Sequence, residues 1–80
     1  MMLYEKARKF LSGDRVRLNI PEMELEDFRD IIKQYNLKNG GLYKLENVLD
    51  VTGVKDPFVM FTIKPNGDAL PLGHRLFDEV

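Results

Sequence analysis

The sequence predicts a small α+β domain in which an antiparallel sheet of about five strands is combined with two helices. Three segments carry this prediction: residues 13–18 near the start of the chain, residues 40–45 in the middle and residues 75–80 at the end. Each sets a turn signal beside a short, mostly alternating apolar run, which is typical of strands in a compact antiparallel sheet. The first half of the chain also shows apolar residues at helical spacing.

The whole chain, residues 1–80, is expected to form a single domain. With 80 residues and a hydrophobic content of 44%, it can bury one modest core. No repeat, low-complexity segment or linker divides it. We expect an N-terminal helix over residues 1–12, then the sheet over residues 13–80, with a helix inserted after the first strand at about residues 22–35.

Both helices are predicted from the spacing of their apolar residues. In the first helix these residues are Leu3, Ala7, Phe10 and Leu11. In the inserted helix they are Leu25, Phe28, Ile31, Ile32 and Tyr35. Acidic residues fill the first turns of the inserted helix, where the helix dipole favours them. Its exit is expected at Asn36, Asn39, Gly40 and Gly41, with the two glycines as the C-cap and the turn after it.

The strands are predicted from alternation and turn residues. They cover residues 16–20, 42–51, 57–63, 69–72 and 77–80. A change of phase within the second strand predicts a bulge or bend near Glu46-Asn47. Asn66-Gly67 predicts a type I′ hairpin, because both residues accept a positive φ angle. Residues 73–76 predict a single helical turn before the last strand.

The chain begins its sheet with Gly13-Asp14-Arg15-Val16-Arg17-Leu18 and, after a long excursion, continues with three strands that are joined by a loop and a tight hairpin. A one-turn helix then leads into the ending Arg75-Leu76-Phe77-Asp78-Glu79-Val80. In this order the chain resembles the SH3-like small barrels, in particular short uncharacterised phage and bacterial proteins of that shape. The resemblance covers residues 13–80 and implies a five-stranded antiparallel SH3-like barrel. That family includes peptide-binding, RNA-binding and structural proteins, so it implies a shape and no single function.

The residue inventory argues against an enzyme and against a bound metal or cofactor. The chain has no cysteine, its one serine has no nucleophile motif around it, and its one histidine, His74, lies beside Arg75 in a predicted turn. Acidic residues on a helix fan around its axis and do not converge on a cation. Gly40-Gly41 leaves a helix instead of leading into one, so it does not form a phosphate loop. We therefore predict a protein without catalytic residues.

The strand at residues 57–63 is apolar on both of its faces. Val59, Phe61 and Ile63 are expected to fill the core, so Phe58 and Met60 point the other way and need a cover. Either helix or a second protein could supply that cover, and the sequence leaves all three open.

If a second protein covers this strand, Phe58 and Met60 form the apolar centre of its binding site. Acidic Glu24 and Asp27 on the inserted helix, and basic Arg15 and Arg17 on the first strand, would then frame the centre. The sequence therefore predicts a non-catalytic protein-binding module. The family resemblance alone implies the setting, a phage or bacterial accessory protein that docks on a cellular protein.

Two other functions stay open at this point. The first is RNA or DNA binding through Arg15 and Arg17, with Tyr43 or Phe58 for base stacking, although a net charge of −1 lacks the usual basic excess. The second is a structural subunit that self-associates, for example as a homodimer. The absence of cysteine, of an apolar run of about 20 residues and of a signal peptide favours a cytoplasmic location.

Overall fold

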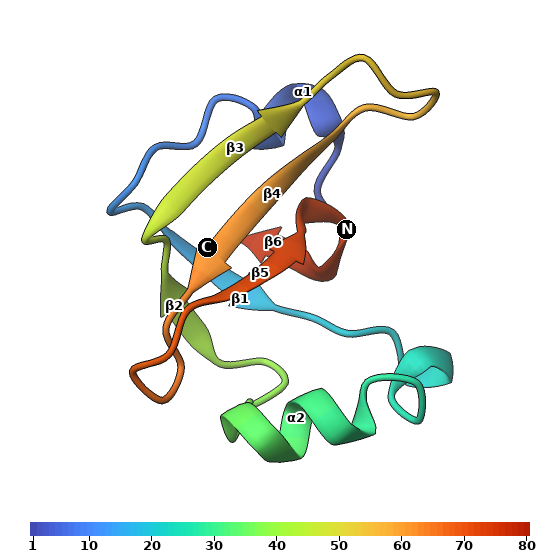
Figure 1. Ribbon diagram of the computed structural model, residues 1–80, viewed down its shortest axis with the longest axis vertical. Coiled ribbons are helices and arrows are strands. Elements are labelled where there is room, and N and C mark those ends of the chain that lie inside the picture. The colour runs from blue at the N-terminus through green and yellow to red at the C-terminus, as the bar shows by residue number, and fades with distance from the viewer.

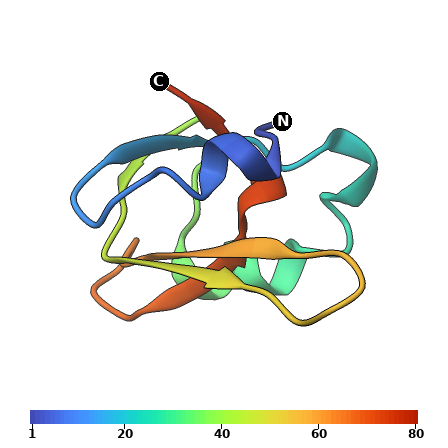
Figure 2. The same cartoon turned by 90° about the horizontal axis from the view of Figure 1, so that it is seen from above.

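The protein folds into two three-stranded antiparallel sheets, as the computed structural model of residues 1–80 shows (Figure 1). The first sheet has the order β2-β1-β6 and consists of β1 (Arg15–Leu18), β2 (Leu42–Lys44) and β6 (Phe77–Glu79). The second sheet has the order β3-β4-β5 and consists of β3 (Asn47–Val51), β4 (Phe58–Ile63) and β5 (Leu70–Gly73). Seen from above, the two sheets form two layers (Figure 2).

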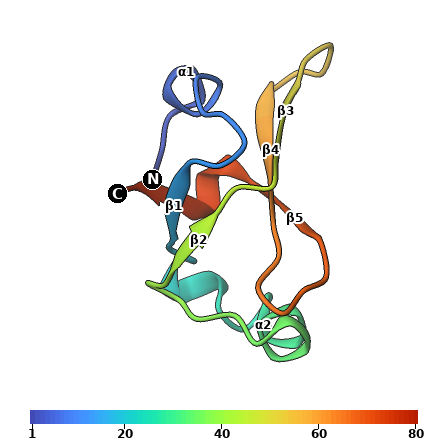
Figure 3. The same ribbon diagram turned by 90° about the vertical axis from the view of Figure 1, so that its left-hand side faces the viewer.

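Short helical segments lie at the ends of the space between the sheets. The helix α1 (Tyr4–Ala7) lies at one end and α2 (Arg29–Tyr35) at the other (Figure 3). Two 3-10 turns complete the fold: η1 (Glu22–Glu24) precedes α2, and η2 (His74–Leu76) connects β5 to β6. The predicted single helical turn at residues 73–76 is therefore confirmed as η2.

The core lies between the sheets and follows the alternation of the strands. Val16 and Leu18 of β1 and Val59, Phe61 and Ile63 of β4 have no exposed surface, so the prediction that this face of β4 fills the core is confirmed. The ring of Phe61 lies 5.6 Å from that of Phe77 and 5.7 Å from that of Phe10. Phe61 therefore joins both sheets and the segment after α1 in one core.

The prediction of a five-stranded barrel with two helices is wrong. The chain forms six strands in two sheets, and the sheets do not close into a barrel. The predicted strand over residues 42–51 divides because its hydrogen-bond partner changes. The N–H of Leu45 donates to Asp14 beside the first sheet (2.8 Å), whereas the N–H of Glu46 donates to Thr62 of β4 (2.7 Å). The predicted bend near Glu46-Asn47 is confirmed at this point.

The predicted helix over residues 1–12 is a single turn. After Arg8 the helical bonds give way to three-residue turns, such as Phe10 N–H to the carbonyl of Ala7 (3.1 Å), and the chain turns so that Phe10 reaches the core. Leu3 and Leu11, both expected on the apolar side of the helix, are 73% and 70% exposed. One turn of helix is hardly stable by itself, so tertiary contacts hold α1 in place. The Tyr4 hydroxyl donates a hydrogen bond to Asp50 of β3 (2.6 Å).

The predicted inserted helix over residues 22–35 is also shorter. Only residues 29–35 are α-helical, and residues 22–24 form η1. The backbone of Phe28, at φ −97° and ψ 4°, separates the two. Of the residues predicted to form the exit, Asn36 ends the helix: it has a left-handed φ of 53°, and Leu37 N–H donates to the carbonyl of Ile32 (2.9 Å), which is typical of a helix C-terminus. The predicted cap at Gly40-Gly41 is wrong, because these glycines lie in a separate turn, where Gly41 N–H donates to the carbonyl of Lys38 (2.9 Å).

The predicted type I′ hairpin at Asn66-Gly67 is wrong in its turn type. A type I′ turn needs positive φ at both central residues, but of this pair only Gly67 has one, at 94°. The turn instead spans Lys64 to Gly67, with Pro65 and Asn66 at its centre and a long 3.5 Å bond from the N–H of Gly67 to Lys64. Proline at the second position of a turn fixes φ near the value that an ordinary turn requires, which explains the difference.

Candidate functional site

The outward side of the second sheet carries no charged side chain. The strand register places Leu49 opposite Met60, Val51 opposite Phe58, and Pro71 opposite Thr62. Because side chains alternate along a strand, all of these lie on the side opposite Val59 and Phe61. We call this surface the outer face; it consists of Asn47, Leu49, Val51, Phe58, Met60, Thr62, Pro71 and Gly73.

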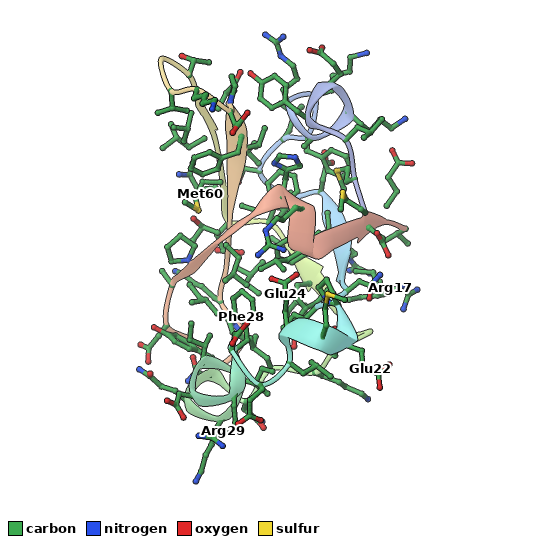
Figure 4. The ribbon with its side chains drawn as sticks, turned by 90° about the vertical axis from the view of Figure 1, so that its right-hand side faces the viewer. Arg17, Glu22, Glu24, Phe28, Arg29 and Met60 are labelled. Carbon is green, nitrogen blue, oxygen red and sulfur yellow. The ribbon has the colours of Figure 1, made fainter.

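Neither helix covers the outer face. α1 and α2 lie at the ends of the space between the sheets, and the outward side of β3, β4 and β5 faces away from both (Figures 2 and 3). Met60 points away from the body of the molecule (Figure 4). Leu49 is 55% exposed, and Phe58 and Met60 are half-buried by their sheet neighbours. Of the three covers that the sequence left open, the chain therefore supplies neither of the two helical ones.

The structure does not bring the other predicted site residues together around Phe58 and Met60. Arg15 and Arg17 are exposed on the first sheet, and Arg17 lies on the opposite side of the molecule from Met60 (Figure 4). Asp27 is exposed in the turn between η1 and α2. Only Glu24 lies near the border of the outer face, through its contact with Arg75.

Glu24 and Arg75 form a two-pronged ion pair that joins η1 to η2. The Arg75 guanidinium donates from Nη2 to Oε1 (2.7 Å) and from Nη1 to Oε2 (3.0 Å) of Glu24. This hydrogen bonding lowers the pKa of Glu24, although partial desolvation acts in the opposite direction. The pair fixes a short segment that has few other anchors, since Met23 of η1 is 89% exposed.

A hollow of about 250 Å³ lies beside the outer face, lined by Phe58, Gly73, His74 and Arg75. The His74 side chain is 9% exposed, and its Nδ1 accepts a hydrogen bond from the Val59 N–H (3.1 Å). Burial lowers the pKa of His74, so the imidazole is neutral near pH 7. With Nδ1 acting as acceptor, the proton lies on Nε2, which has no partner within the protein.

This role of His74 was not predicted from the sequence, which placed the residue only in a turn beside Arg75. The alternation of residues along β5 does indicate this buried position. Leu70 and Leu72 are buried on β5, and the same period of two places His74 on their side of the strand, directed inward. The histidine therefore continues the buried face of β5 past the end of its hydrogen-bond ladder and satisfies an amide of β4.

The basic residues of the first sheet form a separate surface. Arg15 lies directly opposite Lys44 across β1 and β2, and neither takes part in an ion pair. Arg17 donates to the carbonyl of Gly40 (2.7 Å). Tyr43 is half-buried opposite the core residue Val16, and its hydroxyl accepts from the Lys38 N–H (2.9 Å). Neither Tyr43 nor Phe58 is therefore placed to stack bases beside these cations.

Other sites of possible chemistry are few. A larger hollow of about 430 Å³, near the two ends of the chain, includes none of the predicted site residues; it is lined by Met1, Met2, Leu3, Lys6, Asp78 and Glu79. No three acidic or histidine side chains converge where they could hold a metal ion. No helix of this fold has the length and apolarity needed to cross a membrane.

Comparisons with known proteins identify no relative: no protein-family model, no curated protein and no solved structure matches the chain. Any function assigned to it therefore depends on the geometry of its own surfaces. The uncharged outer face and the hollow beside it are the features that most need an explanation.

Proposed function

We propose that the protein is a non-catalytic binding module that uses the outer face of its second sheet to recognise an apolar, uncharged segment of another protein. One observation carries this proposal: the outer face has no charged residue and is left uncovered by both helices, although 31% of the chain is charged. Apolar patches that a small domain leaves open are typical of interaction sites.

The anatomy of the surface supports this function. Phe58 and Met60 are half-buried and held by flanking strands, so they can bury more surface in a complex without losing much side-chain freedom. The hollow between Phe58 and His74 has room for one apolar side chain of a partner. The ion pair of Glu24 and Arg75 lies at the rim, where charges usually contribute more to specificity than to affinity.

The cellular setting is part of the proposal. A chain without cysteine suits a reducing compartment such as the cytoplasm. The role of a phage or bacterial accessory protein, which the sequence resemblance implies, stays a prediction.

The test is a comparison of captured proteins among three immobilised baits. These are the parent protein, the double variant Phe58→Asp/Met60→Asp, and the double variant Arg15→Glu/Arg17→Glu, each checked for folding by circular dichroism. We expect mass spectrometry to identify a protein that the parent and the arginine variant retain and that the folded outer-face variant loses. Retention of every captured protein by the folded outer-face variant would rule this surface out.

A second candidate function, nucleic-acid binding by the first sheet, is favoured by a different observation. Like charges that face each other across two strands destabilise a sheet, yet Arg15 faces Lys44 and neither has an anionic partner. A phosphate backbone would relieve this repulsion. If this function holds, affinity for a single-stranded oligonucleotide falls steeply with salt, and Arg15→Glu abolishes it whereas Met60→Asp does not. Salt-independent or undetectable binding would exclude this candidate.

A further inference from the structure

The free edge of β3 is the longest free sheet edge in this fold, and it carries neither proline nor a charged side chain on the outer face. β3 has five residues, whereas β2 and β6 have three each and present charged residues such as Lys44 and Asp78. β5 carries Pro71, which has no N–H to offer. Charged, short or proline-containing edges are the usual protection against edge-to-edge pairing. β3 has no proline, and its one charged residue, Asp50, points inward, where Tyr4 and Arg8 engage its carboxylate.

The direction of the backbone groups on β3 follows from the bond at His74. Because the Val59 N–H points toward His74, it points away from β3, and Asp50, which faces Val59, does not bond to it. The N–H and C=O of Asp50 therefore point to the free edge. By alternation, those of Val48 do the same. No segment of the chain bonds to these groups, and Figure 3 looks onto this edge.

We propose that two copies of this chain pair through β3 in antiparallel orientation, about a two-fold axis that passes beside Leu49. This pairing goes beyond the proposed function and does not depend on it. In this register Val48 of one copy faces Asp50 of the second, and each such pair exchanges N–H···O=C bonds that use the free groups of the edge. The two second sheets then form one continuous sheet.

The side chains fit this register. Leu49 faces Leu49 of the second copy, so the most exposed apolar side chain of the outer face is covered by its own symmetry mate. The charge of Asp50 does not oppose this pairing, because the carboxylate lies on the inner side. There it accepts a hydrogen bond from Tyr4 (2.6 Å) and lies near Arg8 (3.8 Å). The two outer faces become one uncharged surface.

Two variants of Leu49 with opposite charges test this pairing by sedimentation equilibrium. The parent should show a concentration-dependent mass that approaches twice that of the monomer. Leu49→Lys and Leu49→Asp should each weaken dimerisation by about tenfold or more, because they place like charges on the two-fold axis. An equimolar mixture of the two variants should form the heterodimer. Met60→Lys, which adds the same charge to the outer face away from the axis, should leave the dimer intact.

Three results would overturn the proposal. The first is a parent protein that stays monomeric at every concentration. The second is a dimer that both Leu49 variants retain, which would place the contact elsewhere. The third is a dimer that Met60→Lys dissolves as fully as Leu49→Lys, which would show face-to-face stacking instead of edge pairing. Circular dichroism confirms folding of each variant. None of these results bears on whether the folded Phe58→Asp/Met60→Asp variant loses a captured partner, so the two proposals can fail separately.

Discussion

His74 completes the hydrogen bonding of β4 where β5 ends. Its Nδ1 accepts from the Val59 N–H, and its ring lies 6.2 Å from that of Tyr4 of α1. Replacement by phenylalanine keeps the packing and leaves a buried amide without a partner, which costs about 1–3 kcal/mol. We therefore expect His74→Phe to lower the free energy of unfolding in urea by this amount at pH 7. Equal stability of parent and variant would show that water or another group satisfies Val59.

The same residue predicts how stability depends on pH. Burial lowers the pKa of His74 below its ordinary value of 6.5, so the unfolded chain takes up a proton at a higher pH than the folded protein does. The contribution of neutral His74 to the free energy of unfolding is therefore fully present above pH 6.5. It is lost as the pH falls through that value toward the folded pKa. We expect the parent to lose more stability than His74→Phe between about pH 7 and pH 5. Parallel losses in both proteins would refute this assignment.

Replacement of Gly67 tests the backbone conformation of the turn between β4 and β5. It has a φ of 94°, and a Cβ there would meet no atom within 4 Å, so only backbone strain opposes a side chain. Gly67→Ala should cost about 1–2 kcal/mol. Gly73→Ala is the matched control: it also meets open space, but its φ is −66°. If thermal unfolding finds equal losses for the two variants, strain at Gly67 is not the cause.

At the scale of elements, η1 and α2 depend on a few contacts at the end of the core. Phe28 is half-buried and packs against the core from this segment, while Phe61 is completely buried. We expect Phe28→Ala to cost about 1.5–3 kcal/mol and Phe61→Ala about 3–5 kcal/mol in denaturant unfolding. A Phe28 variant as destabilised as the Phe61 variant would mean that the segment belongs to the centre of the core.

The ion pair of Glu24 with Arg75 should control the local order of η1. We expect Glu24→Gln to speed amide hydrogen exchange over residues 22–28 while leaving β4 unchanged, because the bond to η2 is an anchor from a distant part of the chain. Glu26→Gln is the control, since Glu26 pairs only with its neighbour Arg29 (2.8 Å). Identical amide hydrogen exchange in the two variants would show that the ion pair of Glu24 with Arg75 does not anchor η1.

The accuracy of the sequence predictions also differs by element. Strand alternation placed Val59, Phe61 and Ile63 on one face and in the core correctly, because residues two apart on a strand point to the same side. The helices predicted at residues 1–12 and 22–35 are shorter in the structure than predicted. Their apolar spacing is satisfied equally well by turns that bring Phe10 and Phe28 to the core, and short helices depend on tertiary contacts. The sheet change at Leu45-Glu46 was visible only as a bend.

For the candidate site, the sequence identified Phe58 and Met60 as apolar residues on the side of β4 that faces away from the core. It expected Arg15 and Arg17 to frame them, but both arginines lie on the other sheet. That placement depends on which sheet each strand joins, and residues on different sheets share no local pattern. It also missed the hollow at His74, because the hollow is formed where β5 turns into η2. Contacts between distant segments decide such features, and local spacing does not report them.

At the scale of the whole molecule, the outward sides of the two sheets differ in charge. The first sheet is charged outward, with Arg15, Arg17 and Lys44, whereas the second is uncharged outward. A partner that buries the outer face should therefore bind with weak salt dependence, since charge–charge contacts contribute little there. We expect the affinity for a captured partner to change by less than about tenfold between low and physiological salt. A steep decrease, measured by calorimetric titration, would indicate that the first sheet is the binding surface.

The most direct test of the outer face as the binding surface is an amide chemical-shift map of this chain on addition of the captured partner. If the outer face binds the partner, the largest shifts fall on Leu49, Val51, Phe58, Met60 and Gly73, with little change along β1. Shifts concentrated on Arg15, Arg17 and Lys44, with the outer face unchanged, would contradict it.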